Sequence, residues 1–157
     1  MDAVRRYELT NLAVTGLALG HALATWPLAD VAALFGGGAA LVFVLEVVGV
    51  GLGFHRHGMA PQALGVPLVV LGAWPGIVYL AYRVALLGLS PGVEAAAGAA
   101  VLATALDALT EVDAVEEGVW TYPEHPLSTV RWRGVPLWNV AAWLVVVFAT
   151  AMLPTLL

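Results

Sequence analysis

The segment VAALFGGGAALVFVLEVVGVGLG, residues 31–53, decides the fold class. It contains one charged side chain, Glu46, in an otherwise apolar and glycine-rich run. As a helix it would be about 35 Å long at a rise of about 1.5 Å per residue, enough to cross a hydrocarbon core of about 30 Å. The segment therefore predicts a transmembrane helix, and Glu46 is the residue in it that needs an explanation.

The rest of the chain repeats this character. Hydrophobic residues make up 61% of the sequence and charged residues 11%, and the mean hydropathy is +0.91. Such values lie outside the range of soluble domains. Apolar runs of spanning length predict helices at about residues 8–26, 31–53, 66–88, 94–115 and 136–156. We expect an all-α, polytopic membrane bundle of about five transmembrane helices, forming a single domain over residues 1–157 in the cell membrane.

Composition also excludes several functions. The chain has no cysteine, so disulfides and thiolate chemistry are excluded. The net charge of -5 argues against a nucleic-acid partner. No nucleotide-binding, serine-hydrolase or zincin motif occurs, no internal repeat stands out, and we expect no cofactor. The acidic, lysine-free, alanine- and valine-rich usage resembles that of salt-adapted, haloarchaeal proteins.

Arginine placement predicts the orientation, because cytoplasmic loops of membrane proteins collect positive charge. Five of the six arginines fall on one side of the predicted helices: Arg5, Arg6, Arg56, Arg131 and Arg133. Only Arg83 falls on the other side. The N-terminus is therefore expected to be cytoplasmic. The alternative for the first segment is a cleaved signal peptide with its site at Ala22-Leu23-Ala24.

Three carboxyl groups at membrane depth are the candidate catalytic residues. Glu46 lies about 10 Å, and Asp107 about 12 Å, from the predicted cytoplasmic ends of their helices. Glu111 lies one turn from Asp107 on the same helix face. A charge at this depth costs several kcal/mol and is rarely kept without a role. We expect Glu46, Asp107 and Glu111 to share one apolar pocket and to carry out acid/base chemistry. The alternative is a structural role, with Glu46 hydrogen-bonded to a neighbouring helix and Glu111 at the interface.

Aromatic and amide side chains are expected at the same level. Trp74, Trp120, Tyr122 and Asn139 are the first candidates for substrate binding. Their rings could line a pocket that stabilises a carbocation by cation–π attraction, or form the aromatic belt common at bilayer interfaces.

Two histidines, His55 and His57, flank Arg56 in a predicted loop. With no third ligand nearby in the sequence they make a poor metal site. We expect no metal, and a loop that meets lipid headgroups instead.

The ordered motifs resemble a known family. LDALTEVDAVEEGVWTY (106–122) followed by RGVPLWNVAAW (133–143), together with LEVVGVGLGF (45–54) and GVPLVVLGAW (65–74), resembles the carotenoid biosynthesis membrane proteins that include the haloarchaeal bisanhydrobacterioruberin hydratase and related carotenoid 1,2-hydratases. The resemblance covers about residues 41 to 143 and adds Trp143 to the binding candidates. The chain departs from the pattern at Val112, where proline is expected, and at Ala142, where glycine is expected. We therefore expect a divergent or shortened member.

The resemblance implies a reaction. Water would add across the terminal C1–C2 double bond of an acyclic carotenoid, without cofactor or metal. A neutral carboxylic acid would protonate the alkene and a carboxylate would accept the proton lost by the attacking water. We expect Asp107 or Glu46 to be the donor and Glu111 the base. Asn139 and Tyr122 would hold the water, and Trp74 and Trp120 would flank the cation.

Two alternatives stay open. One is a carotenoid cyclase, which begins with the same protonation but excludes water. The other is a non-catalytic membrane subunit that binds carotenoid or acts as a scaffold. The expected partners are a carotenoid or other isoprenoid lipid, the membrane lipids and other carotenoid biosynthesis enzymes.

Overall fold

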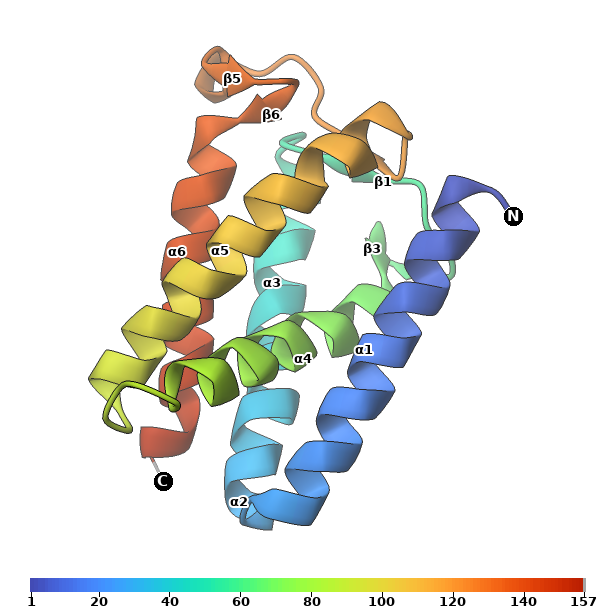
Figure 1. Cartoon of the computed structure of the whole chain (residues 1–157). Helices are drawn as coiled ribbons and strands as arrows, with labels where there is room; N and C mark the ends of the chain where they lie inside the picture. The colour runs from blue at the N-terminus through green and yellow to red at the C-terminus, as the bar shows by residue number, and fades with distance from the viewer. Residues whose placement is uncertain (157) are drawn as a thin grey trace.

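The structure, a computed structural model, describes residues 1–156 as a helical bundle with short strand pairs in the segments that join the helices (Figure 1). The helices are α1 (Ala3–Thr25), α2 (Leu28–Val31), α3 (Gly38–Gly51), α4 (Leu68–Ala85), α5 (Val93–Glu116) and α6 (Leu137–Met152). A π-helical segment, η1 (Ala32–Gly37), joins α2 to α3, and two 3₁₀ turns are η2 (Pro126–Ser128) and η3 (Leu153–Leu156). The strands are β1 (Arg56–His57), β2 (Gln62–Ala63), β3 (Val66–Pro67), β4 (Trp120–Thr121), β5 (Arg131–Trp132) and β6 (Val135–Pro136).

Four helical segments are long and apolar enough to cross a membrane: Leu28–Gly51, Leu68–Ala85, Val93–Glu116 and Leu137–Leu156. The predicted all-α membrane bundle is confirmed. The first predicted span differs from the other four. Its helix, α1, has 23 residues but contains Arg5, Arg6 and Glu8, and it is outside this set of four.

Helix α1 packs along α4 through a glycine pair. A Cβ placed on Gly72 would lie 2.7 Å from Thr15 Cγ2, and one on Gly76 would lie 3.4 Å from Ala18 Cβ. The missing side chains therefore let the two backbones approach closely, as small residues do between membrane helices. Gly16 and Gly20 on α1 are also four residues apart, but a Cβ there would meet nothing within 4 Å, so that pair does not create a close helix contact.

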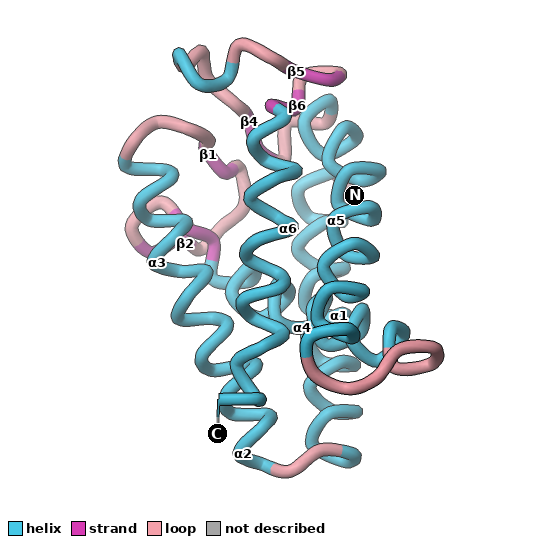
Figure 2. Tube along the Cα trace, turned by 90° about the vertical axis from the view of Figure 1, so that its left-hand side faces the viewer, coloured by secondary structure: helices cyan, strands magenta, loops and turns pink. Residues whose placement is uncertain are grey.

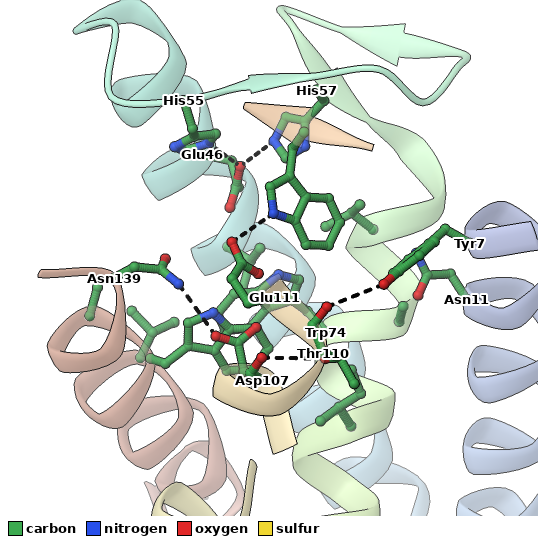
Figure 3. A pocket seen from close by; sticks show the side chains of 18 of the residues that line it. Tyr7, Asn11, Glu46, His55, His57, Trp74, Asp107, Thr110, Glu111 and Asn139 are labelled. Atoms are coloured by element: carbon green, nitrogen blue, oxygen red, sulfur yellow. Dashed lines mark hydrogen bonds and ion pairs between the residues drawn. The ribbon is translucent and has the colours of Figure 1, made fainter. Parts of the chain in front are cut away.

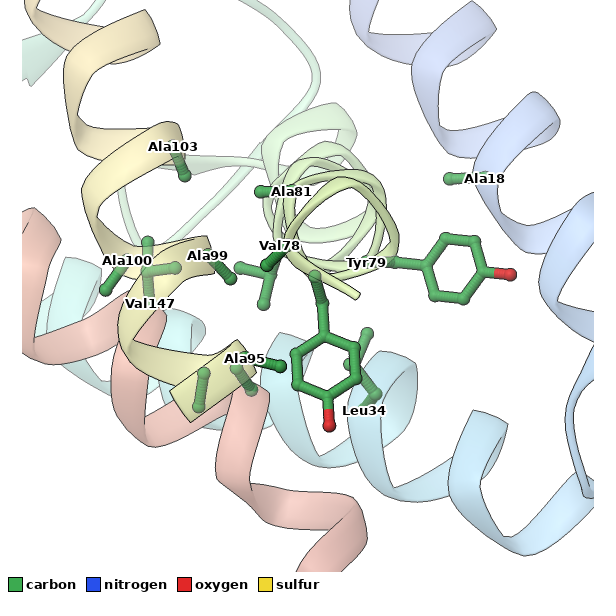
Figure 4. Packing of buried hydrophobic residues seen from close by; sticks show 14 of the residues in the cluster. Ala18, Leu34, Val78, Tyr79, Ala81, Ala95, Ala99, Ala100, Ala103 and Val147 are labelled. Carbon is green, nitrogen blue, oxygen red and sulfur yellow. The ribbon is translucent and has the colours of Figure 1, made fainter. Parts of the chain in front are cut away.

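The core is built largely from alanine. One face of α5, from Ala95 to Ala103, is buried against α4 and α6, and Figure 4 shows these methyl groups facing Val78 and Val147. Tyr79 and Leu34 are fully buried in the same cluster. Small side chains bring three helix backbones together here, so the cavities of the molecule lie elsewhere.

One local structure occurs twice in the chain. The first copy consists of α3, β1, the β2–β3 hairpin and α4, and the second of α5, β4, the β5–β6 hairpin and α6. The glycine two residues beyond each first helix has a positive φ, 79° at Gly53 and 72° at Gly118. This conformation ends a helix at little cost in glycine. No repeat stands out in the sequence, and this one becomes apparent in the structure.

The hairpins of the two copies share their turn chemistry. Leu64-Gly65 and Arg133-Gly134 both have two consecutive residues with positive φ, as a two-residue turn of type I′ requires. A proline then precedes each second helix: Pro67 before α4 and Pro136 before α6. The copies meet where β1 pairs antiparallel with β4. Figure 2 shows β4, β5 and β6 at one end of the helices and β2 lower down, beside α3.

Candidate functional site

One pocket of about 710 Å³ lies between the two copies, below the β1–β4 pair. It is lined by α1, α3, α4, α5, α6 and the segments that follow α3 and α5. All eight residues singled out from the sequence line it: Glu46, Trp74, Asp107, Glu111, Trp120, Tyr122, Asn139 and Trp143. The structure thus brings together side chains that are spread over nearly 100 residues of sequence, although their roles stay predictions.

The centre of the pocket is a pair of carboxyl groups on α5. Asp107 and Glu111 are buried, with 7% and 3% of their surface exposed. One turn separates them, so their side chains lie one above the other on the same face of α5. The Asn139 side-chain amide on α6 donates to Asp107 Oδ2 at 3.3 Å. No cation pairs with either group among the described residues, so the pair is a natural place for a shared proton.

Two donors from β4 and the residue after it hold Glu111. The Trp120 indole N–H donates to Glu111 Oε1 at 2.6 Å, and the Tyr122 hydroxyl donates to the same oxygen. Residues two apart on a strand point to the same face, which is why both reach one carboxyl group. Burial, and next the charge of Glu111, raises the pKa of the Tyr122 hydroxyl well above its usual range. Tyr122 therefore stays a proton donor in this bond.

Two imidazoles hold Glu46. His55 Nε2 lies 2.7 Å and His57 Nε2 lies 2.8 Å from Glu46 Oε2, and all three side chains are largely buried. The expectation that the two histidines lack a third potential ligand was wrong. Figure 3 shows the two imidazoles beside Glu46. Their separation from Glu46 in the sequence hides this contact, which forms because the chain turns back after α3, where Gly53 has a positive φ.

The three acids share one pocket, as predicted, but they divide into two groups. Glu46 lines the same pocket as Asp107 and Glu111, and in Figure 3 Glu111 lies between the other two. The hydrogen bonds of Glu46, however, go to His55 and His57. The site is therefore a carboxyl pair plus a separate carboxylate–imidazole group.

The two glutamates occupy equivalent places in the internal repeat. His55 and His57 follow Glu46 by nine and eleven residues, and Trp120 and Tyr122 follow Glu111 by nine and eleven residues. His57 pairs directly with Trp120 in the β1–β4 ladder. We call these groups the histidine clamp (Glu46, His55, His57) and the aromatic clamp (Glu111, Trp120, Tyr122).

Two tryptophans form a wall of the pocket. The rings of Trp74 on α4 and Trp143 on α6 stack with centroids 3.8 Å apart and planes 17° apart. Each lies seven residues beyond the proline of its copy, so the stack also joins equivalent positions of the repeat. Both residues line the cavity, and aromatic rings suit an apolar or cationic group.

Sequence reasoning missed part of the lining. Tyr7 and Asn11 on α1, Thr110 on α5 and Trp138 on α6 also line the pocket. The Tyr7 hydroxyl donates to the Thr110 carbonyl at 3.2 Å, and Arg6 pairs with Glu117 at 2.5 Å nearby. Tyr7 and Thr110 become neighbours only because the start of α1 approaches the end of α5, and the sequence carries no signal of this contact.

Comparisons of the chain with family models, with curated proteins and with solved structures found no match.

Proposed function

We propose that the protein is a membrane-embedded carotenoid hydratase, which adds water to the terminal C1–C2 double bond of an acyclic carotenoid without a cofactor. The observation that carries the proposal is the buried Asp107–Glu111 pair in an apolar pocket beside stacked tryptophans. An alkene offers an enzyme little to bind except its apolar surface, and its hydration requires a proton donor and a proton acceptor close together.

The roles follow from the hydrogen bonds. Glu111 accepts from an indole and a phenol, whereas Asp107 has a single amide donor beside it. We therefore assign the shared proton to Asp107 and the negative charge to Glu111. Asp107 transfers its proton to C2 as the carboxyl O–H bond breaks, which leaves a tertiary cation at C1.

The second half of the reaction restores the charges. A water molecule attacks C1 and loses a proton to Glu111, and a proton passing between the paired carboxyls returns Asp107 to its starting state. Asn139 and Tyr122 would orient the water, and their position in the pocket lining beside these acids supports this role. Trp74 and Trp143 would stabilise the cation with their ring faces, and Trp120 would add a third ring.

Arginine placement supports a multi-pass orientation in the cell membrane with the N-terminus in the cytoplasm. Arg56 and Arg131 belong to strands at the same end of the bundle as the N-terminus, whereas Arg83 is in the last turn of α4 at the opposite end (Figure 1). Water would then reach the site from the cytoplasmic side and the isoprenoid from the bilayer. Other carotenoid biosynthesis enzymes would supply the substrate.

Expression in a host that makes an acyclic carotenoid tests the proposal. The wild-type chain should produce pigment heavier by one water per modified end. Asp107→Asn and Glu111→Gln should each lower hydration at least about 100-fold, the usual effect of losing a positioned acid or base. Glu116→Gln is the matched control, because Glu116 is an exposed carboxylate on the same helix and should leave hydration unchanged.

Three results would contradict the proposal. Full hydration by both pocket variants would remove the acid/base roles. An isomer of unchanged mass would show a cyclase. Purified protein that carries unaltered pigment would show a binding subunit.

A further inference from the structure

We propose that the histidine clamp is a binding site for a divalent transition-metal ion such as Zn²⁺. Glu46, His55 and His57 each offer one ligand atom, and these atoms all lie within 4.8 Å of one another. Two imidazoles and one carboxylate form a ligand set that proteins use for catalytic zinc and for other first-row metals. Among residues 1–156 this is the one such cluster of three.

The internal repeat shows that holding the glutamate does not require histidine. At the equivalent positions, Trp120 and Tyr122 hold Glu111 through an indole N–H and a phenol O–H. The indole nitrogen is a donor only and has no lone pair for a metal. Each imidazole, in contrast, can present a nitrogen lone pair when its proton is on the other nitrogen. The histidine clamp therefore has two potential metal ligands at the positions where the aromatic clamp has two hydrogen-bond donors.

The helix and strand that carry the three potential metal ligands hold them in place. Glu46 is on α3, and the histidines are at the start and end of a short extended segment that β1 anchors to β4. Gly49, one turn beyond Glu46, leaves room for the His55 ring, since a Cβ there would lie 2.7 Å from His55 Cε1. Donors placed on paired strands and a helix lose little freedom on binding an ion.

The site has an open side. All three residues line the pocket. An ion bound by them would therefore be accessible from the cavity to a further ligand such as water. Catalytic zinc sites have this form, with three protein ligands and one exchangeable position, whereas structural sites are closed by four. The charge of Glu46 and the neighbouring Asp107–Glu111 pair would offset the charge of the ion.

Ion binding does not depend on the proposed hydration, in which Asp107 and Glu111 act without a metal. The two can therefore be tested separately.

Metal titration of the purified chain is the test. After treatment with a chelator, Co²⁺ is titrated and followed by visible absorption, and Zn²⁺ by calorimetry. The wild type should bind one ion per chain. His55→Gln with His57→Gln should weaken binding at least about 100-fold, because the glutamine amide can still donate to Glu46 but is a poor ligand. His125→Gln, which changes a histidine outside the clamp, is the control and should bind like the wild type.

The outcomes are distinct. No stoichiometric ion on the wild type, or equal binding by the double variant, overturns the metal site. Circular dichroism of the double variant shows whether it is folded, and Glu46→Gln provides a second variant that should also lose the ion. Loss of hydration in Asp107→Asn with metal binding intact leaves both proposals standing, whereas a chain that binds the ion and never hydrates carotenoid removes only the proposed function.

Discussion

At the scale of single residues, the two clamps hold a glutamate with the same sequence spacing but with different side chains. Glu46 and Glu111 each accept two hydrogen bonds from side chains nine and eleven residues later. An imidazole can offer a nitrogen lone pair to a ligand, whereas the indole N–H and the phenol O–H act as hydrogen-bond donors to Glu111. The first clamp is therefore suited to bind a ligand, and the second to hold a carboxylate in place.

Gly49 should be sensitive to the smallest substitution. In Gly49→Ala the new methyl group would collide with the His55 ring, at 2.7 Å from Cε1, and overpacking of this kind costs about 1–3 kcal/mol. Gly51→Ala is the matched control on the same helix, since a Cβ there meets nothing within 4 Å. It should raise stability by up to about 1 kcal/mol through helix propensity. Unfolding in mixed micelles measures both, and equal effects would show that His55 does not occupy this position.

The Tyr122 hydroxyl should lose its proton at a higher pH than an exposed tyrosine does. Burial, with the nearby carboxylate of Glu111, raises its pKa well above the usual value. A group whose pKa is raised on folding contributes stability below its unfolded pKa, about 10 for tyrosine, and this contribution is lost as the pH rises toward the folded value. Phenolate absorbance of the folded chain should show a late phase that Tyr122→Phe lacks, and an unaltered late phase in the variant would contradict the buried hydrogen bond.

At the scale of helices and strands, the length of the apolar runs in the sequence predicted most of the helices. The predicted ranges 66–88 and 94–115 correspond to α4 and α5, because apolar length decides such elements in a membrane protein. The range 31–53 corresponds to α2, η1 and α3 joined end to end. The strand pairs were not predicted, because each strand has only two residues and too short a pattern to show alternation.

Part of the internal repeat can be seen in the sequence. GVPL occurs at residues 65–68 and 134–137, with a tryptophan seven residues after each proline. The acids, in contrast, have different neighbours in the two copies, histidines in one and aromatic residues in the other. The shared spacing becomes apparent only when the hydrogen bonds are known.

The α1–α4 contact can be tested through its glycines. Gly72→Ala places a methyl group 2.7 Å from Thr15 Cγ2 and should destabilise the bundle by about 1–3 kcal/mol. Gly20→Ala on α1 should be neutral or stabilising, since its Cβ has no neighbour within 4 Å. Unfolding of the two variants side by side provides the comparison, and an undisturbed Gly72→Ala protein would show that α1 does not pack on α4 in this way.

At the scale of the whole molecule, the placement of the site could be anticipated only roughly. Depth along each helix predicted that Glu46, Asp107 and Glu111 lie at a similar level. Their partners depend on how two copies of one motif meet, and this is set by the β1–β4 pairing and the Trp74–Trp143 stack. Contacts between such distant segments leave no trace in hydropathy or spacing.

The orientation in the membrane can be measured cleanly, because the native chain contains no cysteine. Thr129→Cys places a single thiol at the strand end of the bundle, and Ser90→Cys places one at the opposite end. A membrane-impermeant maleimide should label Ser90→Cys in intact cells and Thr129→Cys only after permeabilisation. The reverse pattern would contradict a cytoplasmic N-terminus.

The most direct measurement of the proposed chemistry is the origin of the oxygen in the product. Cells that make an acyclic carotenoid and express the chain are grown in water enriched in heavy oxygen, and the pigment is analysed by mass spectrometry. Hydration at the Asp107–Glu111 pair predicts one labelled hydroxyl group per modified end and none in the Asp107→Asn cells. Pigment without labelled oxygen, or with equal labelling in that variant, would contradict it.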